Sequence, residues 1–395
     1  MIGALLLVGL SVSLFVGYNI GGSTTGPAFG PAVGSGVLSK AAAGALMAVF
    51  FFVGAWTIGR RVVDTLGRDL VTEPGVFTIE SSIVVLFFIG AGLFVGNYAG
   101  VPASTSMTAV GAIAGLGVAS GTLDWAVMGE IVVWWLVAPI LGFWVSGVVG
   151  RYLYPRIDRW VDARSSEGPL VEVDRSGTLP RPRAGPNTTD RELVGAALVV
   201  VIGCLMAFSS GTSNVANAIA PLYGAGVAMN PLILLACAAV AVGALTIARR
   251  TLDTLGNDLT DLPLTAALVV AVVSSGIVVG LSAVGIPASF VIIATMSIVG
   301  LGWGRASRSV TLAAGVPDET LDGPVDRSTP KGLDGGTLRT GEADRGGETP
   351  ADTSDAVDLF DPETTGRVIL LQNVVPLVST VGSYAAFWAL FTYWW

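Results

Sequence analysis

Small hydroxyl and amide side chains recur in two matching segments of this chain, and they limit the chemistry that it can perform. The segments are Ser23–Pro31 and Ser213–Pro221. The groups that stand out in them are Ser23, Thr24 and Thr25 in the first and Ser213, Asn214 and Asn217 in the second. Such neutral groups can replace the water shell of an ion through hydrogen bonds, but they do not exchange protons near neutral pH. Their pattern therefore favours binding of an ion over acid–base catalysis.

A second hydroxyl cluster is also duplicated. Gly100–Ser104 returns as Gly285–Ser289, and the first copy continues with Thr105 and Ser106. Proline suits the first turn of a helix, and the free N–H groups and dipole at a helix start attract anions. We therefore predict an anion site at helix breaks. Its predicted members are Ser23, Thr24, Thr25, Ser104, Thr105, Ser106, Ser213, Asn214, Asn217 and Ser289.

A third block completes the evidence for a tandem duplication. Arg60–Gly67 reappears as Arg249–Gly256 with Arg-Arg and Asp-Thr-Leu-Gly retained. Polar, glycine-rich breaks between apolar runs in two related halves are typical of secondary transporters, which bind substrate near the bilayer midplane. The alternative for any single Ser or Thr is that it only hydrogen-bonds neighbouring helices.

Other functional classes lack the side chains that they need. The chain contains no histidine, and its two cysteines, Cys204 and Cys237, lie in apolar runs where buried, inert thiols are expected. Carboxylates do not cluster, although Glu80 and Glu130 lie near the starts of apolar runs, where headgroup depth or a functional role would both fit. We therefore predict that the protein is not an enzyme. The sequence identifies no metal ligands and no nucleic-acid-binding feature.

The elements that position these residues are membrane-spanning helices. Hydrophobic residues make up 52% of the chain and charged residues 13%, and the mean hydropathy is +0.72. Eight apolar runs approach or exceed the ~18 residues that cross a bilayer. They cover roughly 1–20, 41–59, 76–99, 125–150, 193–208, 230–248, 263–284 and 368–394. The first run lacks the basic start and cleavage pattern of a signal peptide, so we interpret it as a retained span.

We therefore predict an all-α polytopic protein of the cell membrane, with two inverted-topology repeats and broken or re-entrant helices. An odd number of crossings in each copy would invert the second relative to the first. The predicted segments are a first repeat (1–150), a hydrophilic loop (151–191), the second repeat's first part (192–303), an acidic loop (304–366) and a final span (367–395). Arginines that begin the 151–191 loop favour the cytoplasmic side for it.

The acidic segment 304–366 carries most of the protein's net charge. It holds thirteen acidic and six basic residues, a net of −7 against −8 for the whole chain. Few large apolar residues interrupt it, so we expect a disordered or loosely ordered loop. Two lysines against nineteen arginines, together with acidic loops, indicate a cell with a high-salt interior, as in haloarchaea.

The pattern resembles the inorganic phosphate transporter (PiT) family, which carries a Gly-Ala-Asn-Asp-Val-Ala-Asn motif and a Gly-x-Pro-x-Ser-Thr-Thr-His motif. Gly211–Ala218 matches the first motif closely, and Gly21–Ala28 matches it more loosely. Gly100–Met107 resembles the second motif. The similarity extends over nearly the whole chain except 151–191 and 304–366. It implies two inverted halves and transport of a tetrahedral anion.

The departures from the family pattern are specific. The motif aspartate is Thr24 in one half and Asn214 in the other, and the histidine is Met107. In the second half the hydroxyl motif has become Pro287–Val291. In the family the aspartates look suited to holding sodium beside phosphate. Their loss makes sodium coupling a question for this chain and suits a fully deprotonated anion such as sulfate.

Three functions follow as hypotheses. The first is a secondary transporter of a tetrahedral inorganic anion, phosphate before others, that works by alternating access, with sodium or a proton as the candidate coupling ion and no other cofactor. The second is a sulfate permease of the same family. The third, from another class, is a transport-inactive regulatory or scaffold membrane protein. The expected partners are the anion and the lipid bilayer, with a homodimer as the candidate assembly.

Overall fold

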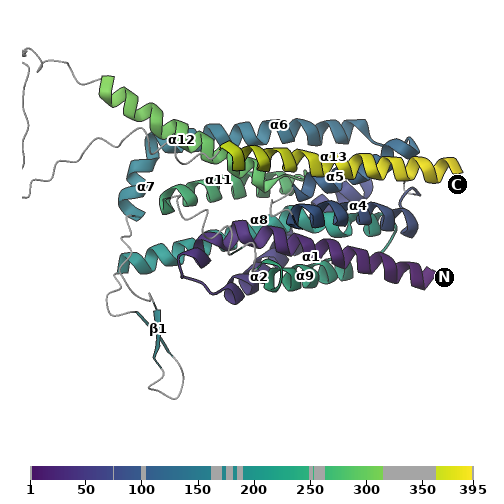
Figure 1. Ribbon diagram of the computed structural model, residues 1–395, viewed down its shortest axis with the longest axis horizontal. Coiled ribbons are helices and arrows are strands. Elements are labelled where there is room, and N and C mark those ends of the chain that lie inside the picture. Colours follow the sequence, from purple (N-terminus) through teal and green to yellow (C-terminus); the bar gives the residue numbers. More distant parts are fainter. Residues whose placement is uncertain are drawn as a thin grey trace, which may run out of the picture.

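Two helical repeats form the body of the protein, which is described here by a computed structural model (Figure 1). It describes residues 2–73, 75–98, 104–161, 171–174, 181–184, 190–248, 252, 263–314 and 362–393. The first repeat consists of α1 (Ile2–Gly34), α2 (Lys40–Thr57), α3 (Gly59–Asp64), a π-helical turn (Thr65–Asp69), α4 (Ile79–Tyr98), α5 (Thr105–Ser120) and α6 (Trp125–Val148). The second consists of α8 (Asp190–Gly224), α9 (Met229–Leu245), α11 (Leu264–Ala283), α12 (Phe290–Ala314) and α13 (Pro362–Tyr393).

Between the repeats lie short elements at one end of the bundle. A π-helical turn (Val149–Leu153) continues α6 into α7 (Tyr154–Val161). Strands β1 (Val171–Asp174) and β2 (Arg181–Ala184) then pair antiparallel, with Val171 opposite Ala184. The predicted loop 151–191 therefore contains regular structure, namely the continuation of α6 into α7 and a pair of antiparallel strands.

The predicted membrane spans are largely confirmed. Among the described residues, eight helices are long and apolar enough to cross a bilayer. Seven of them coincide with predicted runs. The eighth helix, Phe290–Ser307 in α12, was not predicted as a span. The predicted run 230–248 instead forms the shorter helix α9. The protein is a multi-pass membrane protein, and its many exposed apolar side chains suit a surface that faces lipid.

Local sequence signals set the ends of several helices. Ser39 caps α2 by accepting a hydrogen bond from the Ala42 amide, and Asp124 caps α6 through the amides of Ala126 and Val127. Gly121 ends α5 in the left-handed conformation at φ 72°. Gly121 and Asp124 therefore define the short turn between α5 and α6.

Corresponding helices of the two repeats make corresponding contacts. The helix α1 packs along α9 and α8 along α2, while α5 packs along α13 and α12 along α6. At the first pair of interfaces, glycines bring the backbones so close that an added Cβ would lie 2.1–2.2 Å from a carbonyl oxygen of the neighbouring helix. The four contacts are Gly21 with Val240, Gly243 with Tyr18, Gly211 with Phe51 and Gly54 with Phe208. The sequence repeat relates the Gly21–Val240 contact to the Gly211–Phe51 contact. It likewise relates Gly243–Tyr18 to Gly54–Phe208.

The equivalent helices also run in opposite directions (Figure 1). The helix α1 starts at the N-terminus on the right of the view, whereas α8 starts on the left, after the β strands. Likewise α6 leads into α7 on the left, whereas α13 ends at the C-terminus on the right. These directions are those expected of the predicted inverted-topology repeat.

The predicted break within the hydroxyl and amide segments is wrong. The helix α1 continues through Pro27 and Pro31, and α8 continues through Pro221. The N–H that Pro221 lacks would have bonded the Asn217 carbonyl. Close to it, neighbouring helices donate to other carbonyl groups: Ser13 Oγ to that of Ala218 at 2.7 Å and Ser82 Oγ to that of Pro221 at 2.7 Å. Such bonds let proline stay inside a membrane helix.

The hydroxyl motifs, in contrast, do lie at helix starts. Ser104 immediately precedes α5 and Ser289 immediately precedes α12. The helix pairs α4–α5 and α11–α12 each pack against one another after a short connection, as helical hairpins do.

The bounds of the acidic segment also differ from the prediction. The helix α12 extends to Ala314 and α13 begins at Pro362, so both enter the predicted loop 304–366. Ser307 takes part in the fold, since its carbonyl accepts from Arg151 Nη1 at 3.4 Å. The predicted disorder of the segment's centre lies outside the described residues, as do Gly100–Ala103 and most of Arg249–Gly256.

Candidate functional site

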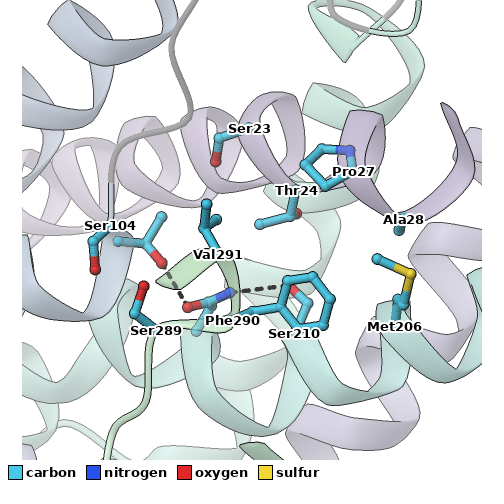
Figure 2. A pocket seen from close by; sticks show the side chains of 12 residues that line it. Ser23, Thr24, Pro27, Ala28, Ser104, Met206, Ser210, Ser289, Phe290 and Val291 are labelled. Atoms are coloured by element: carbon cyan, nitrogen blue, oxygen red, sulfur yellow. Dashed lines mark hydrogen bonds between the residues drawn. The ribbon is translucent and has the colours of Figure 1, made fainter. Parts of the chain in front are cut away.

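A cavity lies where α1, α5, α8 and α12 meet, so that both repeats contribute to its walls. The centres of bound water molecules could occupy about 40 Å³ of this cavity, so it has room for a few waters. Its lining residues are Ser23, Thr24, Pro27, Ala28, Ser104, Thr105, Met206, Ser210, Asn214, Ser289, Phe290 and Val291. Figure 2 shows them converging from separate helices. No ionisable side chain is among them.

The cavity has a polar interior and an apolar mouth. Six of the seven hydroxyl- or amide-bearing lining residues are buried, and Thr24 is partly exposed. Four of the five apolar lining residues are partly exposed: Pro27, Met206, Phe290 and Val291. The polar groups therefore form the deep end.

Asn214 lies at the centre of the hydrogen bonds at the deep end. Its Oδ1 accepts from Thr105 Oγ1 at 2.6 Å, and its Nδ2 donates to Ser210 Oγ at 3.0 Å (Figure 2). Asn217 Nδ2 donates to the same Oδ1 at 3.3 Å from one helical turn away. An amide nitrogen carries two hydrogens, so Nδ2 retains one donor for a bound molecule.

Behind this wall, a second set of bonds closes the cavity and joins the repeats. Ser106 Oγ lies 3.2 Å from Ser213 Oγ, and both hydroxyls donate to the carbonyl of Ala288, at 3.1 and 3.0 Å. Ser213 Oγ also accepts from the Ala288 amide at 3.2 Å. These bonds connect α5, α8 and the segment before α12. They fix the positions of Thr105, Asn214 and Ser289 around the cavity.

The hydroxyls of α1 are satisfied within their own helix. Thr24 Oγ1 donates to the Ile20 carbonyl at 2.7 Å and Thr25 Oγ1 to the Gly21 carbonyl at 2.6 Å. Ser23 Oγ donates to Ile20 at 3.1 Å. Because the helix is continuous here, these residues cannot present free amide groups to an anion, as a broken helix would. A bound molecule would have to draw the hydroxyls themselves away from the helix.

Two polar groups at the site have no hydrogen-bond partner. The Ser289 side chain is 7% exposed and lines the cavity, and its Oγ is unpaired. Asn217 Oδ1 is also buried and unpaired. An unsatisfied buried group costs roughly 1–3 kcal/mol, so the Ser289 hydroxyl is a group that a ligand would stabilise.

The electrostatic field at the cavity comes from backbone dipoles. The N-terminus of α5, with Ser104 as its cap, and the N-terminus of α12 both border the cavity. Each helix start carries a partial positive charge of roughly half an elementary charge. A neutral lining that faces two helix N-termini favours an anion, and it offers hydroxyl and amide hydrogens to bind it.

The structure brings most of the predicted site residues together. Six line the cavity: Ser23, Thr24, Ser104, Thr105, Asn214 and Ser289. Three more lie directly behind the lining: Ser106 and Asn217 are within hydrogen-bond distance of Asn214, and Ser213 bonds Ser106. Thr25 is buried against its own helix and does not line the cavity.

Three important lining residues were not predicted. Ser210 lies one helical turn before Asn214, so its spacing could have revealed it. Met206 and Phe290 are apolar, and their type gave no sign of a site.

The charged residues that the structure describes do not line the cavity. Tyr223 Oη donates to Asp64 Oδ1 at 2.7 Å, and the Arg68 guanidinium lies 4.2 Å from the Tyr223 ring centroid, so the first Asp-Thr-Leu-Gly block is bound to the end of α8. Burial, reinforced by Asp64, raises the pKa of Asp69. Glu80 and Glu130 are exposed. Among the described residues, no three of His, Cys, Asp and Glu are grouped to hold a metal ion.

Comparisons with known proteins agree with this architecture. Residues 20–317 match the sequence profile of the Phosphate transporter family. The sulfate permease CysP of Bacillus subtilis is 30% identical over 309 residues, which are 77% of this chain and 79% of that protein. A protein of Chlamydia trachomatis to which phosphate permease activity is ascribed is 25% identical, over 70% of this chain and 84% of its own. A solved structure of a sodium-dependent phosphate transporter superposes with a TM-score of 0.69 at 15% identity, covering 99% of this chain and 100% of that one.

Proposed function

Since the chain belongs to the Phosphate transporter family, we propose that it is a secondary transporter that carries a tetrahedral inorganic anion, phosphate in the first place, across the cell membrane. The observation that supports this most directly is the cavity, which seven hydroxyl- or amide-bearing residues from both repeats line, with no ionisable side chain among its described lining residues. The family is one of transporters and the cavity contains no nucleophile–base pair, so transport is favoured over catalysis.

The cavity can bind the anion through hydrogen bonds alone. Thr105, Ser104 and Ser289 approach from the two helix starts, and Asn214 has a spare Nδ2 hydrogen. Hydroxyl hydrogens rotate freely, so Thr24 can exchange its bond to Ile20 for one to the anion. Each hydrogen bond to a charged group contributes about 1.5–3 kcal/mol. A few such bonds balance dehydration without binding so tightly that release is prevented.

The cavity's mouth gives the direction of access. Pro27 and Ala28 follow Ser23 along α1, and Met206 precedes Asn214 along α8, so all three lie toward the end of the bundle that carries α7 (Figure 1). Arg151 and Arg156 lie at this end, which the positive-inside rule assigns to the cytoplasm. The conformation would thus be inward-facing, with the Ser106–Ser213–Ala288 hydrogen bonds joining the two repeats beside the cavity. Alternating access would require these bonds to separate.

Sulfate is the second candidate substrate, and the cavity's lack of carboxylates favours it. Phosphate near neutral pH carries a P–OH group that needs an acceptor, and Asn214 Oδ1 already accepts from Thr105. Sulfate needs donors only. A relative at 30% identity is named as a sulfate permease. We therefore expect sulfate to bind at least as well as phosphate does.

Sodium is the candidate coupling ion, with weaker dependence than the family would suggest. Oxygens of Thr105, Ser106, Ser213, Asn214 and Ala288 are grouped within hydrogen-bond distances of one another beside the cavity. They are neutral, so the bound anion would itself supply most of the countercharge for a cation.

Uptake by proteoliposomes tests the proposal. The purified protein should accumulate labelled phosphate or sulfate above protein-free vesicles, and excess unlabelled anion should abolish the signal. A regulatory or scaffold protein would show no uptake of either anion under any cation gradient, although the protein inserts normally.

A further inference from the structure

The aromatic ring of Phe290 occupies a position that the internal repeat assigns to a hydroxyl. Ser104 and Thr105 at the start of α5 correspond to Ser289 and Phe290 at the start of α12. Both pairs line the same cavity. Thr105 forms the 2.6 Å bond to Asn214, whereas its counterpart Phe290 has no polar group to offer. The cavity is therefore asymmetric, with a hydroxyl on one side and a phenyl ring on the other.

The ring lies between the two ends of the cavity. In Figure 2 it separates the hydroxyl-bearing Ser104 and Ser289 from Ala28 and Met206. Phe290 is partly exposed, in contrast to the buried hydroxyls. It also packs against a small apolar cluster of Ala138, Val278, Leu281, Ile286, Ala288 and Ile293. Those contacts hold the residue from α6, α11 and α12 while its ring faces the cavity.

We propose that Phe290 is the gate residue at the mouth of this cavity. Its ring covers the hydroxyls of Ser104, Ser289 and Ser210 on the α7 side, and its size excludes anions that carry a substituent larger than an oxygen atom. This inference rests on the proposed transport of a tetrahedral anion and adds the residue that sets access and selectivity. Rotation of one aromatic side chain would open the cavity without moving a helix.

Removing the ring should leave an apolar void next to an intact oxyanion site. Voids lined by apolar side chains bind small aromatic groups. The Phe290→Ala variant should therefore accept phenylphosphonate, whose phosphonate group fits the hydroxyls and whose phenyl group fills the void. Methylphosphonate is too small to fill it and should gain much less.

The first test is inhibition of uptake in proteoliposomes. We expect phenylphosphonate to inhibit Phe290→Ala at least tenfold more strongly than the native protein, and methylphosphonate to change by less than threefold. Phenylphosphonate should inhibit Phe290→Leu to an intermediate degree. This variant also keeps the test possible if Phe290→Ala folds poorly. Ile292→Ala, on the same helical turn but bordering the adjacent apolar cavity with Trp134 and Trp135, is the matched control and should not gain phenylphosphonate sensitivity.

A second test does not depend on transport. The only two cysteines, Cys204 and Cys237, are buried and can be replaced by alanine, after which Ser210→Cys reports access to the deep end. A membrane-impermeant thiol reagent applied from the α7 side should label this cysteine at least tenfold faster when Phe290 is alanine. The proposal that Phe290 is a gate would be contradicted by equal labelling rates with phenylalanine and with alanine at this position. Unchanged phenylphosphonate inhibition in a folded variant would contradict it as well. If no anion is transported while labelling still accelerates, the proposed function fails and the gate stands.

Discussion

Asn214 is the residue at which the hydrogen bonds of the cavity converge. Its Oδ1 accepts from Thr105 and Asn217, and its Nδ2 donates to Ser210. Thr24 approaches from the opposite helix with a hydroxyl that now bonds its own backbone. The resemblance to the family motif places aspartate at both positions, whereas this chain has neutral side chains there.

Alanine substitutions measure what these groups contribute. Thr24→Ala, Thr105→Ala and Asn214→Ala should each raise the half-saturating anion concentration about tenfold to a hundredfold, because one hydrogen bond to a charge contributes about 1.5–3 kcal/mol. Initial uptake rates over a range of anion concentrations give the answer. Thr57→Ala is the control, since that hydroxyl makes the same bond to its own helix, at 2.6 Å, but is remote from the cavity. Unchanged half-saturation in all three variants would contradict the assignment.

Restoring the family carboxylates tests the link between charge and coupling. Thr24→Asp combined with Asn214→Asp should increase the dependence of uptake on sodium or shift preference toward a protonated anion. The two donors that converge on Asn214 Oδ1, Thr105 and Asn217, would serve a carboxylate oxygen equally well, so the fold should accept the change. Uptake measured against sodium concentration decides the matter. If uptake by the native protein already depended steeply on sodium, hydroxyl and carbonyl oxygens would be sufficient to bind the coupling ion without carboxylates.

The sequence predicted most of the individual residues of the site but not its shape. Nine of the ten named residues line the cavity or contact its lining, because duplication and residue type both marked them. Phe290 and Met206 could not be found in this way. Their contribution depends on which helices meet, and an apolar residue in an apolar chain gives no local signal.

At the scale of elements, close backbone contact between repeats depends on paired glycines. An alanine at Gly54 or Gly211 would place its Cβ 2.1 Å from the carbonyl oxygen of the neighbouring helix. Either substitution should force α2 and α8 apart and destabilise the protein by at least the ~1–3 kcal/mol of an overpacked core. Thermal unfolding in detergent measures the loss. Gly276→Ala, where nothing lies within 4 Å, is the control and should be tolerated.

Helix starts were easier to predict than helix continuity. Proline before three hydroxyls correctly indicated that a helix begins near Ser104, because that residue caps it locally. Prolines within α1 and α8 wrongly indicated breaks. Whether proline breaks a membrane helix depends on donors from other helices, such as Ser13 and Ser82, and these tertiary contacts have no local sequence signature.

For the molecule as a whole, the long acidic segment should be dispensable for transport. Replacing 316–360 by a Gly/Ser linker of about 15 residues should leave uptake within a few-fold of native, because a segment with so few apolar residues cannot repay the entropy of ordering. The replacement keeps α12 and α13 intact, including the Arg151–Ser307 contact. Loss of uptake in a protein that inserts and unfolds normally would mean that the segment gates or docks.

The central claim is that a cavity without ionisable side chains binds a tetrahedral anion through hydroxyls and an amide. Competition between phosphate and sulfate in proteoliposomes, with sodium and pH varied independently, tests it most directly. We predict that sulfate inhibits phosphate uptake at concentrations within about tenfold of phosphate itself, and that sulfate binding does not change between pH 6 and pH 8, because no cavity residue titrates there. Phosphate uptake that excess sulfate leaves untouched, or sulfate binding that changes steeply between pH 6 and pH 8, would contradict the account.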